Sequence, residues 1–245
     1  MRSRNRQTVV FEGIAEKPVV VQFNRPDESS DGGAILLKAV DNRLGLTARM
    51  AASVRDGRQA GKVDHPMVDL IRERVFAIAC GYPDCNDAAT LRTDPVMKLA
   101  CGHSPVEAAD LASQPTLSRF ENALSRTDLF RMAYAMTDSV IASQVQLRHK
   151  VRTITVDMDP TEDPTYGGQQ MTFFNAFYDN WCYLPMVTTI QFDKETEQWL
   201  VAPLLRPGNA KGSLGAIGIL KRLLPRLKAA FPETKSWDNC LAPTC

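Results

Sequence analysis

Four acidic side chains fall within seven positions of the stretch TITVDMDPTEDPTYGGQQ, residues 153–170. The stretch begins as a β-strand, in which alternate residues share a face. Asp157 and Asp159 are therefore expected on one face, roughly 7 Å apart, with Glu162 and Asp163 in the turn that follows. Carboxylates this close repel each other unless a cation or hydrogen bonds hold them. Their oxygens are the ligands that Mg²⁺ takes, and two such ions promote phosphodiester transfer. The alternative is a solvated turn capped by Asp and Thr.

The predicted secondary structure changes from helices to strands near residue 151, just before this acidic cluster. Before it the pattern is helical, with a strong amphipathic helix in HPMVDLIRERVFAIACGY between Pro66 and Gly81. A ribbon of two short strands is expected within residues 8–24. Further helices are expected at 35–44, 86–92, 94–101, 105–112 and 127–146. After residue 151 the sequence predicts strands within 151–159, 171–193 and 198–206, and then an amphipathic helix over 213–231.

Composition excludes some classes of protein. The net charge of +1 gives no global attraction for nucleic acid, so DNA binding would have to use local basic faces. No run reaches the roughly 20 apolar residues of a membrane helix, and a cytoplasmic protein is expected. The six cysteines are expected to be free thiols. Zinc binding by Cys80, Cys85, Cys101 and His103 is a weaker alternative, because structural zinc sites usually use closer cysteine pairs.

The stretch DMDPTEDPTYGGQ resembles the first acidic motif of the DDE-domain transposases of bacterial insertion sequences, and most closely the group known as thirteen-eighty. Further matching stretches follow in the family's order from about residue 8 to about residue 232: SSDGGAILLKAVDNRLGL, RVFAIACGYPDCNDAATLRTDPVMKL, LASQPTLSRFENA, CYLPM and LLRPGN. The resemblance implies an α+β fold, with a helical N-terminal region followed by an incomplete ribonuclease-H-like β-β-β-α unit. The expected division is a β ribbon (1–32), a helical DNA-binding region (33–150), a partial catalytic domain (151–236) and an out-of-family tail (237–245).

The resemblance also implies a metal and a partner. Asp159 fits the family's first metal ligand best and Asp157 is the second choice, with Mg²⁺ or Mn²⁺ as the expected ion, bound weakly or not at all here. DNA at the terminal inverted repeats is the expected partner, in a nucleoid-associated protein that could also self-associate.

DNA contacts are expected from two other stretches. In SQPTLSRFEN, a helix would present Thr116, Ser118, Arg119 and Asn122 to phosphates or base edges; the alternative is an ordinary capped helix. In RPGN, Arg206 and Asn209 could approach DNA, although Asn209 is better explained as the cap of the next helix. The aromatic run between Phe173 and Tyr183 is expected to lie in the core.

The sequence departs from the family after residue 236. The family needs a fourth strand ending in a motif of the type Arg-x-Asp-Ser-Gly and a glutamate on a later helix, but the chain reads SWDNCLAPTC. Asp238 has the wrong neighbours, and no late glutamate is found. We therefore expect a truncated transposase without DNA cleavage activity, whose first strand has an unpaired edge and whose C-terminal domain is marginally stable. A DNA-binding module without nuclease activity, which could compete with an intact transposase, is the alternative function.

Overall fold

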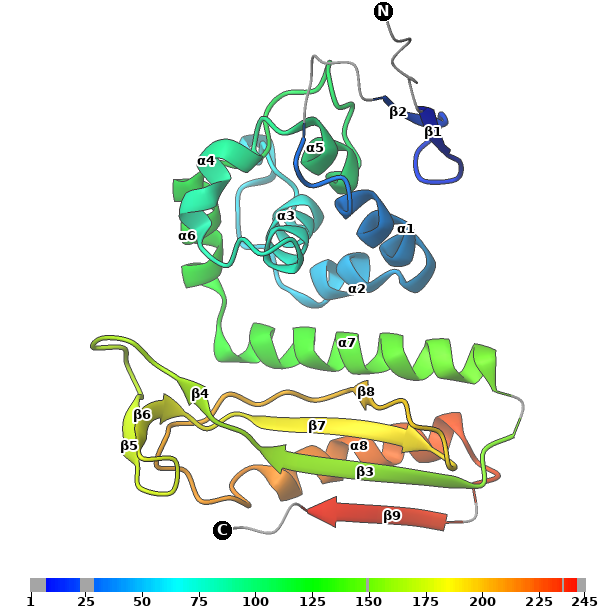
Figure 1. Cartoon of the computed structure of the whole chain (residues 1–245), viewed down its shortest axis with the longest axis vertical. Helices are drawn as coiled ribbons and strands as arrows, with labels where there is room; N and C mark the ends of the chain where they lie inside the picture. Colours follow the sequence, from blue (N-terminus) through cyan, green and yellow to red (C-terminus); the bar gives the residue numbers. More distant parts are fainter. Residues whose placement is uncertain (1–7, 23–28, 149, 235, 242–245) are drawn as a thin grey trace, which may run out of the picture. The chain divides into compact units, whose positions relative to one another are not determined.

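The computed structural model describes residues 8–22, 29–148, 150–234 and 236–241. The fold is α+β, as the sequence predicts, and the chain forms two compact units, Met1–Met132 and Ala133–Cys245 (Figure 1). The units divide within helix α7, whereas the sequence places the boundary near residue 150. Most of α7 belongs to the second unit because Ile141 is buried in that unit's core.

The first unit contains a two-stranded ribbon and a set of short helices. Strands β1 and β2 pair antiparallel, with Thr8 opposite Gln22. The elements are β1 (Thr8–Phe11), β2 (Val19–Gln22), α1 (Ala34–Leu44), α2 (Leu46–Ser53), η1 (Ala60–Lys62), α3 (Met67–Ala79), η2 (Cys85–Asp87), α4 (Ala88–Leu91), α5 (Pro95–Cys101), α6 (Gln114–Ala123) and the start of α7 (Arg126–Leu147).

Helix α3 is the helix around which the first unit packs. Pro66 precedes it, and Gly81 follows it with a left-handed φ of 96°. Its apolar residues face two clusters, Phe76 with α1 and α5, and Leu70 with α6. The periodicity of the sequence therefore gave this helix correctly.

The helix predicted over 105–112 is wrong. This segment contains turns and irregular backbone, and Leu111 donates its N–H to the carbonyl of Arg92. Lys98 and Arg92 both form ion pairs with Asp110. These tertiary contacts hold the segment against its neighbours, and they override a weak local helix propensity.

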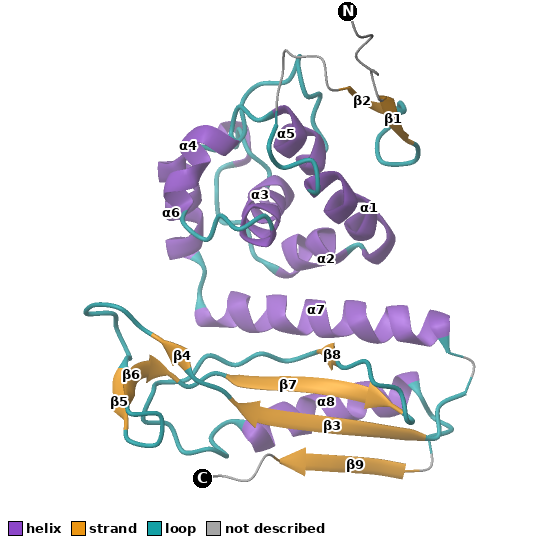
Figure 2. Cartoon of the chain, viewed as in Figure 1, coloured by secondary structure: helices purple, strands orange, loops and turns teal. Residues whose placement is uncertain are grey.

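The second unit contains two sheets and helix α8 (Ala216–Ala230) beside α7 (Figure 2). The larger sheet has the order β8-β7-β3-β9, and the smaller has the order β4-β6-β5. Strand β7 runs antiparallel to β3 and β8, whereas β9 runs parallel to β3. The strands are β3 (Thr153–Pro160), β4 (Asp163–Pro164), β5 (Phe173–Asn175), β6 (Asn180–Tyr183), β7 (Met186–Phe192), β8 (Trp199–Leu200) and β9 (Ser236–Leu241).

One face of the larger sheet is buried under helices. On β3, Ile154, Val156 and Met158 are 0–1% exposed, and they pack with residues of β7, α8 and α7. The intervening residues of β3, including Asp157 and Asp159, lie on the opposite face. The alternation predicted for this strand is confirmed.

Strand β9 overturns the expectation of an unpaired first strand. Ser236–Leu241 pairs with β3 along six residues, with Asp238 opposite Thr155. The expectation failed because β pairing uses backbone groups, which a stretch without an apolar pattern also supplies. The marginal stability predicted for this domain rested on that open edge and loses its basis. The rest of the predicted tail, 242–245, lies outside the described residues.

The aromatic side chains between Phe173 and Tyr183 are more exposed to solvent than expected. Phe173, Phe174, Phe177 and Trp181 are 42–63% exposed rather than buried. They lie on β5, on β6 and in the turn between them. Because β5 has only three residues and its sheet is small, these side chains are not enclosed in a core.

Candidate functional site

Asp157 and Asp159 lie on the face of β3 that the helices leave uncovered. Asp157 is half-buried and pairs in register with Thr189, while Asp159 is exposed near the end of the strand, opposite Val187. The structure therefore brings these two carboxylates onto one face of a central strand. In an extended strand they are about 7 Å apart, close enough to share a cation.

The other two acidic residues of the cluster belong to the smaller sheet. Glu162 accepts a hydrogen bond from the side-chain amide of Asn180 at 2.9 Å. Asp163 starts β4 and is paired with Tyr183. The acidic stretch is thus divided between two sheets, since β3 ends at Pro160 and the chain turns there.

Arg206, predicted to contact DNA, is buried at 2% exposure. Its Nε donates to the carbonyl of Leu184 at 2.8 Å. Its Nη1 lies 2.8–3.2 Å from three carbonyls, those of Lys211, Gly212 and Leu214. Burial lowers the pKa of Arg206. The guanidinium thus links the loop before α8 to Leu184 through hydrogen bonds. Because it is buried, it cannot contact a phosphate in this conformation.

The rest of RPGN forms a turn against the smaller sheet. A Cβ on Gly208 would lie 2.2 Å from the carbonyl oxygen of Cys182, so only glycine fits there. The side chain of Asn175 also donates to the carbonyl of Gly208. Asn209 is exposed in the turn, and α8 begins seven residues later, after Gly215. The preferred interpretation of Asn209 as a helix cap is therefore wrong, and a DNA contact by Asn209 stays a prediction.

The predicted DNA contacts of SQPTLSRFEN lie on α6 and divide between two of its faces. Thr116 and Arg119 point the same way, and their side chains lie 3.4 Å apart. Ser118 and Asn122 lie on another face, where the amide of Asn122 donates to the carbonyl of Ser118 at 2.7 Å. Only the first pair faces a cavity.

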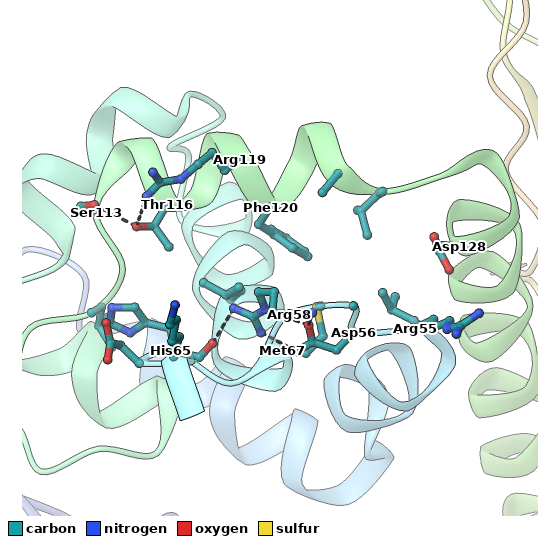
Figure 3. A pocket seen from close by; sticks show the side chains of 18 of the residues that line it. Arg55, Asp56, Arg58, His65, Met67, Ser113, Thr116, Arg119, Phe120 and Asp128 are labelled. Carbon is teal, nitrogen blue, oxygen red and sulfur yellow. Dashed lines mark hydrogen bonds and ion pairs between the residues drawn. The ribbon is translucent and has the colours of Figure 1, made fainter. Parts of the chain in front are cut away.

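This cavity has a volume of about 1280 Å³ and lies between α6 and the segment that joins α2 to α3. Figure 3 shows Thr116 and Arg119 on one wall, with Arg58 and His65 on the facing wall. Apolar side chains, among them Met67 and Phe120, form part of the lining. The cavity lies entirely within the first unit.

The charges of the cavity are partly paired. Arg58 bonds Asp56 at 2.7 Å, and these hydrogen bonds lower the pKa of Asp56 to about 2. Arg55, Lys62 and Arg119 are exposed, and in the described part of the chain they form no ion pair. Free cations of this kind on a concave wall attract phosphate groups.

Sequence reasoning missed the loop that supplies most of these cations. Residues 53–65 read SVRDGRQAGKVDH, with two arginines, a lysine and two glycines. The density of basic residues in a glycine-containing loop is the signal that could have found it.

The first unit also buries several ionisable side chains that the sequence did not indicate, among them Glu73 and Lys38. Glu73 is 2% exposed, and burial raises its pKa from 4.5 to about 7. One of its oxygens accepts the N–H of Ala112, and the other has no hydrogen-bond partner among the described residues. Lys38 is 6% exposed, and burial together with the nearby Arg72 lowers its pKa.

A zinc site is not formed by the residues weighed for it. The four cysteines whose side chains the structure describes are free thiols, and Cys101 is buried. His103 lies 3.0 Å from a carboxylate oxygen of Asp69. Across residues 8–22, 29–148 and 150–234, no three His, Cys, Asp or Glu side chains are grouped so as to hold a metal ion.

The larger sheet and its acidic strand define a class of protein. A central first strand lies between an antiparallel second strand and a parallel fourth strand, which is the order expected of a ribonuclease-H-like domain. The family model for the transposase DDE domain, group 1, matches residues 11–237, and the chain belongs to this family. No curated protein and no solved structure matches it. In the described residues, none of the helices has the length and apolar character needed to span a bilayer.

Proposed function

We propose that the chain is a transposase polypeptide that binds DNA at the ends of an insertion sequence through its helical region, residues 33–150. Its β3 strand carries the first carboxylates of what is, in an intact relative, a metal-dependent centre for DNA strand transfer. One observation carries this proposal: Asp157 and Asp159 lie on the open face of the central strand in a member of the DDE transposase family.

The finer part of the proposal is membership of group thirteen-eighty, with a catalytic domain that departs from the family's second acidic motif. It is supported by the sequence DPTED at the strand end and by LLRPGN before α8. In place of the Arg-x-Asp-Ser-Gly motif, β9 has the sequence SWDNCL. Because β9 departs from the motif that carries the family's second aspartate, the chain is proposed to bind DNA without cutting it.

Asp159 and Asp157 are the residues that would hold Mg²⁺ or Mn²⁺. In a complete centre of this kind, two such ions activate the attacking oxygen and stabilise the leaving one. A two-metal centre takes ligands from several elements, whereas these two carboxylates come from one strand. The residues present therefore fit weak binding of one ion and do not fit the complete centre, and no catalytic step follows from them.

Metal binding is tested by titrating Mn²⁺ into the full chain and following the water-proton relaxation rate. We expect one weak site that is lost in Asp159→Asn and weakened in Asp157→Asn, with Asp193→Asn as the exposed control on the same unit. Two tightly bound ions would contradict the proposal.

DNA binding and cleavage are tested separately. The full chain is mixed with duplexes that carry the ends of the insertion sequence, with and without Mn²⁺, and followed by gel shift and by strand-break analysis. We expect a sequence-specific shift without nicks. Nicking at the ends by the chain alone would refute the incomplete centre, and the lack of any shift would refute DNA binding.

A second candidate function is a DNA-binding module that acts without any nuclease role, for example as a competitor of an intact transposase. The cationic cavity beside α6 favours it, because that cavity lies wholly in the unit without the acidic strand. Adding the chain to an active transposase of the same element should then lower the yield of joined product. Self-association and a location with the nucleoid in the cytoplasm belong to both proposals.

A further inference from the structure

The β5–β6 hairpin exposes three large aromatic side chains, here called the aromatic surface. Phe174 is 48% exposed, Phe177 63% and Trp181 57%. Phe174 and Trp181 are opposite each other in the hairpin, with their rings edge to face at 6.3 Å. Folded proteins seldom leave such a group in water unless it is an interaction surface.

The charged side chains of the segment that contains the aromatic surface are all acidic. Residues 153–193 contain no Lys, Arg or His, and their acidic residues include Asp163 and Asp179 beside the hairpin. Both are exposed; Asp163 starts β4, which pairs with β6, and Asp179 ends the turn before Asn180. A polyanion such as nucleic acid is repelled here, whereas a cationic partner with apolar side chains is attracted.

The same chain carries a surface of that opposite kind. Residues 198–232 contain no Asp or Glu, and their basic residues include Lys221 and Lys228. These two lie on the exposed face of α8 together with Ile217, which is 69% exposed. The opposite face of α8, with Leu223 and Leu227, is in the core. Ile217, Lys221 and Lys228 are here called the basic face.

We propose that the aromatic surface of one copy binds the basic face of α8 on a second copy. An ammonium group over an exposed aromatic ring gains a cation–π interaction, which is strongest for tryptophan. Lys221 can in addition pair with Asp163 or Asp179, while Ile217 packs against the rings. The two surfaces differ, so the contact is head to tail and each copy offers one half of two interfaces.

This proposal is independent of metal and DNA binding, since neither the residues Asp157 and Asp159 nor the cavity beside α6 takes part in it. Failure of metal or DNA binding would leave it standing, and its own failure would leave the proposed metal and DNA binding standing.

Two double variants of the full chain test it by sedimentation velocity. The aromatic variant carries Phe174→Ser and Trp181→Ser, and the basic-face variant carries Ile217→Asp and Lys221→Glu. The unaltered chain is expected to associate at micromolar concentration. Each variant alone is expected to associate at least about tenfold more weakly. An equimolar mixture should give dimers and nothing larger, because each mixed pair retains one intact interface.

Phe173→Ser is the control, since Phe173 is on β5 next to Phe174 but points to the other face of the strand. It should associate like the unaltered chain. Circular dichroism establishes that each variant is folded, and rising salt should weaken the association of the unaltered chain because opposite charges draw the surfaces together.

Several outcomes would overturn the proposal. The first is an unaltered chain that stays monomeric at about 100 μM, a concentration well above the dissociation constants of specific interfaces. The second is an equimolar mixture that stays monomeric. The third is a double variant that associates like the unaltered chain. Micromolar binding of a labelled single-stranded oligonucleotide, lost in the aromatic variant, would instead assign this surface to nucleic acid.

Discussion

Glu73 is a carboxyl group that the fold holds almost without water. Its pKa is raised to about 7 in the folded chain, above the ordinary value of 4.5, because burial disfavours the charged form. The neutral form therefore stabilises the fold fully below pH 4.5, and this stability is lost as the pH rises through about 7. The difference amounts to up to about 3 kcal/mol.

The prediction for Glu73 follows from this sign. Glu73→Gln, which cannot ionise, should raise the free energy of unfolding at pH 8 by roughly 1–3 kcal/mol and leave it nearly unchanged at pH 4.5. Urea unfolding at both pH values measures it. Glu107→Gln, at an exposed position, is the matched control and should change little at either pH. If the stability of Glu73→Gln depended on pH as that of the unaltered chain does, the raised pKa of Glu73 would be contradicted.

Arg206 is predicted to be structural in the folded chain. Arg206→Met keeps an unbranched apolar stem but removes the donors to Leu184 and to the loop before α8. Four carbonyls then lose a charged partner, the one of Leu184 in a buried hydrogen bond, which should cost about 3 kcal/mol. Thermal or urea unfolding measures the loss. Lys211→Met, an exposed change in the same loop, should cost less than about 0.5 kcal/mol.

At the scale of elements, β9 is the strand that decides whether β3 has an open edge. A chain that ends after Thr234 lacks β9, whereas a chain that ends after Leu241 keeps it. Removing β9 leaves the backbone groups of β3 without partners along six positions. The loss should lower the stability of the second unit by about 3–5 kcal/mol.

Hydrogen exchange measured by mass spectrometry tests this prediction. Amides in Ile154–Met158 should exchange much faster in the chain ending at Thr234 than in the chain ending at Leu241. Equal exchange in both chains would mean that β9 does not pair with β3 in solution.

At the scale of the whole molecule, a net charge of +1 leaves DNA binding to local groups. If α6 and its cavity contact DNA, Arg119→Ala should weaken binding about tenfold and reduce the salt dependence of binding by about one phosphate contact. Fluorescence anisotropy over a series of salt concentrations measures both. Arg152→Ala, an exposed change in the second unit, is the control and should leave the salt slope unchanged. An unchanged slope for Arg119→Ala would remove this arginine from the proposed interface.

The sequence by itself determined the features that depend on local periodicity. The helical pattern between Pro66 and Gly81 gave α3, and the alternation of Ile154, Val156 and Met158 with acidic residues gave β3 and its two faces. It also gave the family, since the motifs lie in one order along the chain. These features follow from neighbours in sequence, where side-chain spacing and backbone geometry are directly linked.

Only the tertiary structure decided which edges and surfaces are covered. In the folded chain Ser236–Leu241 pairs with β3, Arg206 is buried with hydrogen bonds to four carbonyls, and Trp181 is exposed to solvent. The tertiary structure also joins the 53–65 loop to α6 around one cavity. Each of these outcomes depends on segments far apart in sequence, and the spacing of residues within one segment carries no information about what packs against it.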